Sequence, residues 1–533
     1  MKEKNINIEQ APIASKLIKI FLSGNKLKNF YSFKNDIKNY DKLIKQRSSF
    51  SQKKRLLLHN VIEEQYKNID DLGSVSESIN DLRKPNTFTI TTGHQLSLNT
   101  GPLYYIYKIL HCIKISKGLK EKYSKYNFIP IFWMASEDHD FNEIKSFQTK
   151  NRKYEIDANK SGLCTGRTKP LNLSKIIDEL DDNFKNKPFK DEVITLFKSA
   201  YDNERSLAES TKRLVHSIFK DYGLVIIDAD NYDFKSSFKH ILEDEISNLS
   251  CHNHVLNTNK KISNLLKEKI KFQVNPRKLN LFLIENDKRY RIEYSKGEYN
   301  ILGTELSFKK AEILKLLNNN PEMFSPNVLM RPVYQEFLLP NLSYVGGKAE
   351  IAYWLQLKSL FQHHQIPFPI LTLRNSVLLL NKRDLDLLNK NKIKLIDLLS
   401  SKDIFIKNLV NNNIQNNFDL ETNKSEFESA FKKLLKATLD IDKSLESLVK
   451  SAQSKQLKIF DSIEKKIIKS HKRKISENIN SCEKIYDKVY ADGIFQERRL
   501  NYSEFYSYIG KNMIKLIYES IHPFDNKIIV VEI

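Results

Sequence analysis

Three apolar segments, each followed at once by polar or glycine-containing sequence, constrain the fold of this chain more than any other feature. Residues 87–92 (TFTITT) end at Gly93, residues 128–134 (FIPIFWM) lead into an acid-rich segment, and residues 223–230 form a third β-rich run. Helix-spaced apolar residues follow the first run, beginning at Leu103. Strands that alternate with helices predict an α/β fold with a parallel sheet, in which ligands bind beyond the carboxyl ends of the strands.

Other segments indicate additions to this core. Residues 276–308 alternate in short apolar stretches, which predicts an antiparallel β insertion. We expect residues 332–362 to form a further strand, a glycine loop and a helix, and residues 369–373 to form one more core strand. A chain of 533 residues also exceeds what one hydrophobic core usually serves, so two or three structural units are expected.

A heptad pattern marks the last third of the chain. Apolar or small residues recur in alternating steps of four and three from Phe427 to Ala452, and less regularly as far as Val489, before Gly493. This seam predicts either a long antiparallel helical hairpin within one chain or a coiled coil that pairs two chains. The seam alone leaves both possibilities open.

The composition narrows the classes of function. A formal net charge of +22 would ordinarily suggest nucleic acid or an acidic membrane surface as a partner. The lysines are spread along the whole chain, however, which favours a composition bias and makes nucleic acid an unlikely ligand while still attracting small anions. The four cysteines contain no C-x-x-C pair, and residues 1–10 lack the apolar run of a signal peptide. We therefore expect reduced thiols, no membrane span and a cytoplasmic location.

The first candidate site segment is T-G-H-Q at residues 92–95, with Gly101 six residues beyond it. We expect Gly93 to adopt the positive φ of a strand-to-helix turn, so that the N–H groups of the following helix start bind an anion. His94 and Gln95 would face that anion. The ordinary alternative is a turn that binds no ligand.

The second segment follows residues 128–134 and is the strongest local signal in the chain. Glu137, Asp138, His139 and Asp140 place three carboxylates and an imidazole side by side, an arrangement that calls for a substrate ammonium, a metal or acid/base chemistry. The alternative without a functional role is a solvated loop whose acids cap the N-terminus of a helix. A zinc site at His139 is disfavoured because no Cys or other His lies at ligand spacing, so no metal is predicted.

The third segment is Y-V-G-G-K-A-E at residues 344–350, preceded by R-P and Q-E at residues 331–332 and 335–336. Paired glycines let the backbone approach a ligand closely, and an acid in the first turn of a helix can recognise an amine or simply complement the helix dipole. Arg374, which follows the last core strand, could bind a substrate carboxylate in bidentate fashion or form a structural ion pair. We expect binding contributions from Gln335, Tyr344, Gly346, Gly347, Glu350 and Arg374.

Together these motifs resemble a known family. T-G-H-Q-x5-G-P, F-W-M-A-S-E-D-H-D-F, R-P-V-Y-Q-E-F-L-L-P-N-L-S-Y-V-G-G-K-A-E and the late Q-E-R-R at residues 496–499 match, in order, the bacillithiol biosynthesis cysteine-adding enzymes, also called cysteine ligases. Two departures stand out. Many members have Gln at the position of His94, which favours hydrogen bonding over proton transfer there, and Lys348-Ala349 replaces a common P-G pair.

The resemblance implies a fold and a reaction. The fold is a Rossmann-like parallel sheet core with connecting insertions and a C-terminal helical coiled coil that forms homodimers. The implied domains are residues 1–380, the catalytic core with N-terminal helices and a β-containing insertion at about 255–330; residues 381–493, helical, with the coiled coil at about 424–490; and residues 494–533, returning to the core. The implied reaction is amide formation between cysteine and glucosaminyl-malate, the last step in making the low-molecular-weight thiol bacillithiol.

An amide bond requires an activated carboxylate, so we expect ATP or another nucleotide as co-substrate. In this hypothesis the turn at Gly93 binds the anion, the acids around Asp138 hold the cysteine ammonium or the sugar, and His139 accepts the proton of the attacking amine. Gln335 and Glu350 orient the sugar conjugate. The alternatives are a nucleotidyl- or aminoacyl-transferring enzyme, which the missing H-x-G-H motif disfavours, and a non-enzymatic coiled-coil protein that binds nucleic acid.

Overall fold

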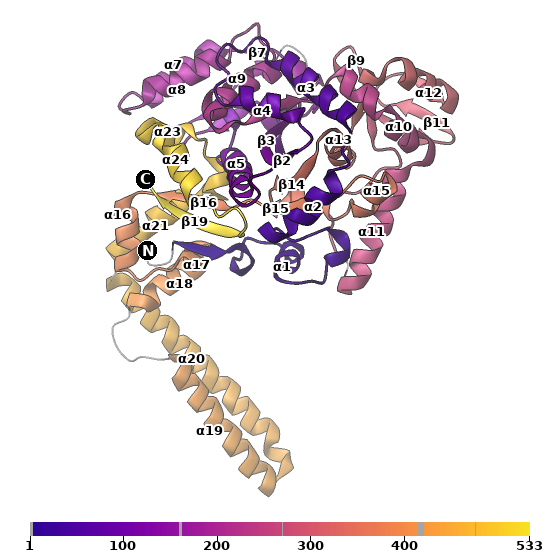
Figure 1. The fold of residues 1–533 in the computed structure, drawn as a ribbon. Helices are drawn as coiled ribbons and strands as arrows, with labels where there is room; N and C mark the ends of the chain where they lie inside the picture. Colours follow the sequence, from indigo (N-terminus) through magenta and orange to yellow (C-terminus); the bar gives the residue numbers. More distant parts are fainter. Residues whose placement is uncertain (1–3, 159–161, 269, 414–419, 475) are drawn as a thin grey trace. The chain divides into compact units, whose positions relative to one another are not determined.

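The computed structural model describes residues 4–158, 162–268, 270–413, 420–474 and 476–533 (Figure 1). It contains two compact units. The larger unit comprises Asn5–Leu379 and Ile494–Val531, and the smaller one consists mainly of Leu380–Gly493. Among the described residues, no helix combines the length and the apolar character needed to cross a membrane.

A five-stranded sheet in the order β15-β14-β2-β3-β8 forms the centre of the larger unit. Every neighbouring pair in it is parallel. The predicted α/β fold with a Rossmann-like parallel sheet is therefore confirmed. The strands are β2 (Thr87–His94), β3 (Asn127–Met134), β8 (Val225–Asp228), β14 (Asn341–Gly346) and β15 (Ile370–Leu373).

The order of these strands creates a switch point. From β2 the chain adds β3 and then β8 on one side, and it later returns to add β14 and β15 on the other side. The connections therefore leave β2 and β14 in opposite directions across the sheet. In open α/β sheets the crevice beyond the carboxyl ends of two such strands is where ligands bind.

Two helices cover one face of this sheet, α2 (Tyr40–Arg47) and α5 (Tyr104–Lys122). Phe88 and Ile90, two positions apart on β2, point to this face because side chains alternate along a strand. They belong to a continuous buried cluster that includes Tyr40, Leu43, Ile44, Cys112, Ile115, Leu119, Phe128, Leu342, Val345 and Ile370.

The insertion between β8 and β14 contains a second sheet, in the order β12-β11-β10-β9-β13, in which every neighbouring pair of strands is antiparallel. This confirms the antiparallel β insertion predicted around residues 276–308. Its strands are β9 (Leu281–Glu285), β10 (Lys288–Ser295), β11 (Glu298–Ile301), β12 (Ser307–Lys309) and β13 (Phe324–Pro326).

The prediction that a strand begins near residue 332 is wrong. Arg331–Leu338 forms helix α13, and the strand β14 begins only at Asn341. Pro332 stands in the first turn of α13, where its missing N–H costs nothing and its fixed φ suits a helix. The glycine loop, Gly346 and Gly347, then leads into helix α14 (Lys348–Trp354), as expected.

The smaller unit contains the heptad segment. Helices α19 (Leu420–Ile441) and α20 (Glu446–Lys474) are joined by a short turn and pack side by side as a hairpin (Figure 1). The rings of Phe427 and Phe460 lie 5.0 Å apart across it, and Lys424 pairs with Asp461 at 2.9 Å. Of the two arrangements left open by the seam, the described chain contains the intramolecular hairpin.

Candidate active site

A cavity of about 850 Å³ lies at the carboxyl edge of the parallel sheet. Residues 93–95 at the end of β2, residues 135–139 after β3 and residues 347–350 after β14 all line it. Asp230 follows β8 and Arg374 follows β15, so every strand of the sheet supplies a lining residue. The three segments singled out in the sequence therefore meet around one cavity.

One side of the cavity carries a buried ion-pair network. The Lys235 ammonium, from helix α10 (Tyr232–Asn248), lies 2.6 Å from Glu137 Oε1 and 2.9 Å from Asp230 Oδ1. Arg167 forks onto Asp230, with N···O distances of 2.9 and 3.1 Å. Burial raises the pKa of Glu137, and the neighbouring Asp230 adds to this effect. Glu137 is thus held by a cation of the protein itself.

Asp138 stands beside this network and is fixed from several directions. Gln95 Nε2 donates to Asp138 Oδ2 at 2.6 Å and to Glu143 Oε2 at 2.8 Å. The backbone N–H of His139 donates to Asp138 Oδ1 at 2.8 Å, and Arg289 Nη1 lies 3.9 Å from that oxygen. Gln95, which we expected to face an anionic ligand, instead links two carboxylates of the cavity wall.

His139 is suited to accept a proton. Its Nδ1 lies 3.7 Å from Asp138 Oδ1, and its ring centroid lies 5.4 Å from that of Phe282 in the β insertion. Burial, with a contribution from the positive charge of Arg289, lowers the pKa of His139 below its ordinary value of 6.5. The imidazole is therefore neutral at pH 7 and can act as a base.

Across the switch point, Lys108 joins β2 to the glycine loop. Its ammonium donates to the carbonyl of Gly93 and to both carboxylate oxygens of Glu350, at 2.9 and 2.8 Å. The Lys108 side chain is 2% exposed. A buried ammonium requires such partners, because an unpaired charge in this environment is very costly.

Glu350 is held ionised by its neighbours. The Tyr344 hydroxyl donates a hydrogen bond to Glu350 Oε1 at 2.5 Å, and the N–H of Gly347 donates one to Glu350 Oε2 at 2.8 Å. Although burial opposes ionisation, the Lys108 charge and these hydrogen bonds lower the pKa of Glu350 to about 2. Glu350 is therefore an anion throughout the neutral range.

Arg374 forms a structural ion pair, one of the two alternatives that the sequence left open. Its guanidinium forks onto Glu497 of helix α22 (Gln496–Arg499), at 2.9 and 2.8 Å, and the two side chains are 4% and 1% exposed. Both terminal nitrogens of the guanidinium are used in this ion pair. Arg374 thus anchors the returning C-terminal segment while one of its surfaces faces the cavity.

The expectation for Gly93 as a turn residue is wrong. Gly93 lies inside β2, without a positive φ, and the next long helix, α5, begins only at Tyr104. A Cβ at Gly93 would lie 3.1 Å from the carbonyl oxygen of Trp133 on β3. Glycine is needed here for the close approach of two strands, and no helix N-terminus follows it directly to bind an anion.

His94 is a half-buried hydrogen-bonding residue. Its Nδ1 lies 3.1 Å from the carbonyl oxygen of Gln95 and its Nε2 lies 3.1 Å from the Tyr104 hydroxyl. Burial lowers its pKa to about 4, so the ring is neutral at pH 7. This agrees with hydrogen bonding rather than proton transfer at this position.

Cations without carboxylate partners line the rest of the cavity. Arg331 donates to Gln335 Oε1 at 3.0 Å and to the Tyr353 hydroxyl at 3.2 Å. Within the described ranges, no carboxylate lies within 4.0 Å of Arg331 or Arg498 in an ion pair. Burial lowers the pKa of Lys348, a third lining cation, to about 8. The cavity therefore has an acidic side and a side that can accept an anion.

Four of the predicted site residues do not line the cavity. Asp140 is exposed next to it, and Gly346 accepts the N–H of Arg374 through its carbonyl. Gln335 is fully buried and donates to Glu336 at 2.9 Å. Gly101, with a φ of 61°, has its carbonyl bonded by Asn501 at 2.6 Å.

Sequence reasoning missed several lining or supporting residues, of which Lys108 had the clearest signal. It lies in the apolar stripe Tyr104, Lys108, Cys112, where a lysine on the buried face of a helix needs an acidic partner. Asp230 could have been found at the end of the third predicted strand. Lys235 and Arg289 carried no comparable signal, because the acids of the second segment that they approach, Glu137 and Asp138, lie 98 and 151 residues earlier in the chain.

These features define an α/β protein of the Rossmann-like class, with a charged cavity at the switch point of its sheet, the arrangement by which such proteins bind small polar ligands. Comparison with known proteins narrows this class. Residues 1–375 match the model of the bacillithiol biosynthesis BshC N-terminal Rossmann-like domain, and residues 377–533 match that of the BshC C-terminal coiled-coil domain.

Relatives similar along the whole chain carry one name, "Putative cysteine ligase BshC". The protein of Flavobacterium johnsoniae is 36% identical over 98% of both chains, and that of Flavobacterium psychrophilum is 36% identical over 97% of both. The protein of Cytophaga hutchinsonii is 33% identical, over 98% of this chain and 97% of its own. The chain therefore belongs to the bacillithiol biosynthesis BshC family, whose curated relatives bear the name of a ligase.

Proposed function

We propose that this protein is a ligase that joins the carboxylate of cysteine to the amine of glucosaminyl-malate, as the last step of bacillithiol biosynthesis. The observation that carries the proposal is the convergence of three distant segments on one cavity that is acidic on one side and cationic on the other. Both substrates carry charges of both signs. Such a cavity can hold an ammonium near one carboxylate and the carboxylates of malate near unpaired cations.

The acidic side fits the reacting end of the substrates. Asp138 is the acid best positioned to bind an ammonium, because Glu137 is already paired with Lys235. When the sugar amine attacks the activated acyl carbon, a C–N bond forms and the bond to the leaving group breaks. His139, neutral at pH 7, takes the proton released by the amine.

The cationic side fits the malate group. Arg331 presents a guanidinium fork without a carboxylate partner in the described part of the chain, and Arg498 lies nearby over the Tyr104 ring. A guanidinium binds a carboxylate in bidentate fashion, which gives both affinity and orientation. Tyr344, whose ring centroid is 5.7 Å from the Arg331 guanidinium, and Glu350 lie beside this cation, and Glu350 can accept a hydrogen bond from a sugar hydroxyl only if Lys108 remains its counter-ion.

ATP or another nucleotide is the proposed co-substrate that activates the cysteine carboxylate. The strand-to-helix connection after Gly93 is not a phosphate loop, since α5 starts eleven residues later, at Tyr104. The cations Arg331, Lys348 and Arg498 suit phosphate oxygens as well as carboxylates. A nucleotide phosphate and the malate group would therefore both draw on this side of the cavity.

The reaction can be tested directly. Purified protein is mixed with cysteine and glucosaminyl-malate, with and without ATP, and the amide product and the nucleotide products are followed by mass spectrometry. Asp138→Asn and His139→Gln should lower kcat by about 100-fold to 10,000-fold, the usual contribution of a positioned acid–base group. With wild-type protein, kcat should fall as the pH drops below the ordinary imidazole pKa of 6.5 and His139, whose pKa is lowered by burial, becomes protonated.

Asp140→Asn is the matched control, because Asp140 is adjacent in sequence but does not line the cavity. It should retain activity within about threefold of the wild type, as expected for a surface change of about 0.5 kcal/mol. Absence of product from folded wild-type protein with ATP and both substrates would reject the proposed reaction. Equal losses in Asp140→Asn and Asp138→Asn would reject the assigned site.

Two further parts of the proposal concern assembly and location. We infer a homodimer formed through the hairpin of α19 and α20, because apolar side chains remain on its outer surface, among them Leu434, Leu445, Leu448, Ile459 and Ile463.

A biosynthetic ligase of a small thiol would work in the cytoplasm. The domain boundaries near residues 380 and 493 remain part of this proposal.

A further inference from the structure

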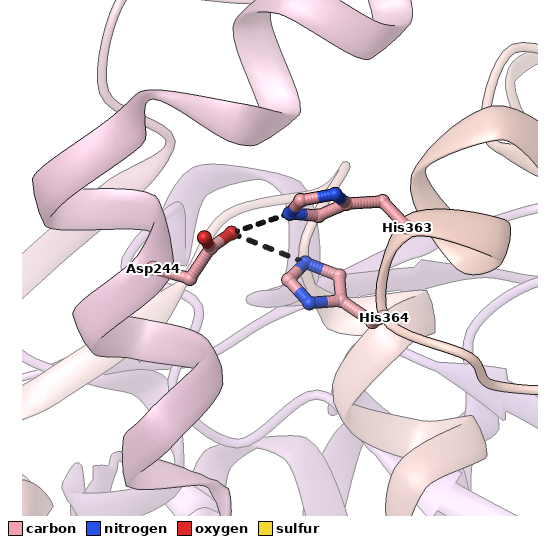
Figure 2. A group of neighbouring side chains, drawn as sticks. All are labelled: Asp244, His363 and His364. Atoms are coloured by element: carbon pink, nitrogen blue, oxygen red, sulfur yellow. Dashed lines mark hydrogen bonds and ion pairs between the residues drawn. The ribbon is translucent and has the colours of Figure 1, made fainter.

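Asp244, His363 and His364 form a cluster outside the cavity described above (Figure 2). Asp244 belongs to helix α10, while His363 is the last residue of helix α15 (Lys358–His363) and His364 is its C-cap. One potential ligand atom from each side chain lies within 4.8 Å of the other two. Two histidines and one carboxylate are a set of donors that Zn²⁺ commonly accepts.

The distances fit the span of a metal ion. Asp244 Oδ2 lies 3.0 Å from His363 Nε2 and 3.8 Å from His364 Nε2. For tetrahedral Zn²⁺ with bonds of about 2.0–2.1 Å, neighbouring ligand atoms lie about 3.3–3.4 Å apart. Shifts of a few tenths of an ångström would bring both separations to this value, and Figure 2 shows both rings directed at the same carboxylate oxygen.

His364 provides an independent sign of a missing partner. Its side chain is 6% exposed, and its Nε2 has no hydrogen-bond partner among the described residues. The 3.8 Å to Asp244 is too long for a hydrogen bond. Burial lowers the pKa of His364 to about 4, so the ring is neutral and its nitrogen can offer a lone pair.

The carboxylate is oriented by a second contact. Asn248, one turn further along α10, donates from Nδ2 to Asp244 Oδ1 at 2.8 Å, which directs the other oxygen, Oδ2, toward the two imidazoles. Hydrogen bonds of this kind to the outer atom of a ligand are typical of metal sites, where they fix the ligand geometry. His254 Nδ1 lies 2.7 Å from Ser359 Oγ, and its ring lies 4.8 Å from that of His363.

We propose that Asp244 Oδ2, His363 Nε2 and His364 Nε2 bind one divalent transition-metal ion, with Zn²⁺ as the preferred occupant and water in the fourth position. The ion would tie the end of α15 to α10. Because α15 follows α14 and the glycine loop, this tie would hold the segment behind that loop. The site is separate from the cavity and takes no part in the proposed ligase chemistry.

The test uses the full-length, tag-free protein after treatment with a chelator. Titration with Co²⁺ should give the visible absorption of a four-coordinate ion at one equivalent per chain, and Zn²⁺ should displace it. Asp244→Asn and His363→Gln should each weaken Zn²⁺ binding by at least about 100-fold, since loss of outer hydrogen bonds alone costs about 10–100-fold. Zn²⁺ should also raise the Tm of the wild type but not that of the two variants.

His252→Gln is the control, since His252 lies on the neighbouring helix α11 (Ser250–Leu266) and its Nδ1 is 3.0 Å from the Arg277 carbonyl oxygen, outside the cluster. It should bind Zn²⁺ within about twofold of the wild type. The exposed position of His363 makes His363→Gln the variant least able to disturb folding. Wild-type protein that binds Zn²⁺ no more tightly than folded His363→Gln, or a Co²⁺ complex without four-coordinate absorption, would overturn the proposal.

Discussion

Lys108 and Glu350 face each other at a point where Lys108 is almost removed from water and Glu350 is only partly exposed. The low pKa of Glu350 means that its ionised form is stabilised by the fold more than by the unfolded chain. The pair therefore supports both the stability of the sheet edge and the charge pattern of the cavity.

Glu350→Gln should destabilise the protein at pH 7 by about 3–5 kcal/mol, because it leaves the Lys108 ammonium buried without a counter-charge. The stabilising effect of the wild-type carboxylate is present above the ordinary pKa of 4.5 and is lost as the pH falls toward about 2. Urea unfolding at pH 7 and near pH 3 should thus show a difference between wild type and variant that shrinks in acid. Glu519 is exposed, so Glu519→Gln is the control, and its free energy of unfolding should differ from that of the wild type by no more than about 0.5 kcal/mol at either pH. A pH-independent difference for Glu350→Gln would contradict the stabilising role assigned to the ionised carboxylate.

Arg331 is the residue proposed above to bind the malate group. Replacing Arg331 with Gln removes a charged hydrogen-bond donor worth about 1.5–3 kcal/mol, so the KM for glucosaminyl-malate should rise roughly tenfold to hundredfold while that for cysteine changes little. Steady-state kinetics with each substrate varied in turn provide the measurement. Arg83→Gln, on the exposed surface, is the control; equal increases in both KM values would argue against a role in binding the malate group.

At this scale the sequence predicted which residues approach the cavity better than what each one does. Asp138 and Glu350 could be identified because acids beside a strand end or a glycine loop have few structural reasons to be there. Their partners Arg289 and Lys108 come from other elements, and only the folded sheet brings these side chains together. The partner of Gln95 was likewise hidden, since Asp138 lies 43 residues further along the chain.

At the scale of the element, β2 depends on a glycine near its end. A Cβ at Gly93 would lie 3.1 Å from the Trp133 carbonyl oxygen and 3.3 Å from the Trp133 Cβ. These contacts are with backbone and with the root of a side chain, so the two strands themselves would have to separate.

Gly93→Ala should therefore lower the free energy of unfolding by about 1–3 kcal/mol, the usual cost of overpacking. Gly24→Ala is the matched control, because its φ is −137° and its added Cβ would make only an ordinary contact of 3.7 Å. Thermal unfolding of the two variants distinguishes them. A Gly93→Ala protein as stable as Gly24→Ala would show that β2 and β3 adjust more freely than their packing suggests.

The elements were predicted well where the apolar pattern had one interpretation. Residues 87–92 and 128–134 are continuous apolar or β-branched runs bounded by polar residues, and both became buried parallel strands. Residues 332–338 contain β-prone residues interrupted by polar ones, but Pro332 in a first turn marks a helix start, and this signal outweighed the β propensity of Val333 and Tyr334.

At the scale of the whole molecule, the homodimer proposed above would form through the hairpin of α19 and α20. Leu448 is 64% exposed and Leu434 is 51% exposed on the described surface of the hairpin. If these side chains are buried between two copies, Leu448→Glu should convert a dimer to a monomer at micromolar concentration, as measured by light scattering after size-exclusion chromatography. Ser447→Glu adds the same charge beside the stripe and should leave the mass unchanged; a monomeric wild type would refute the homodimer.

The heptad seam could not decide this question because one apolar stripe can pack within a chain or between chains. The order of strands in the main sheet was equally beyond the sequence. The alternation of strands and helices indicates parallel pairing, but whether β14 joins beside β8 or beside β2 depends on which edge its buried side chains and Asn341 fit. In the structure the Asn341 side chain accepts hydrogen bonds from Thr89 and Thr91 of β2, across 252 and 250 residues.

That long separation has a consequence for synthesis. Until residue 341 has left the ribosome, β2 can only be the outermost strand of a β2-β3-β8 sheet, with its N–H and C=O groups unpaired along one side. A ribosome-bound chain of this length would be prone to aggregate and would have no closed binding site, so chaperone protection during translation matters most for the stretch between β8 and β14.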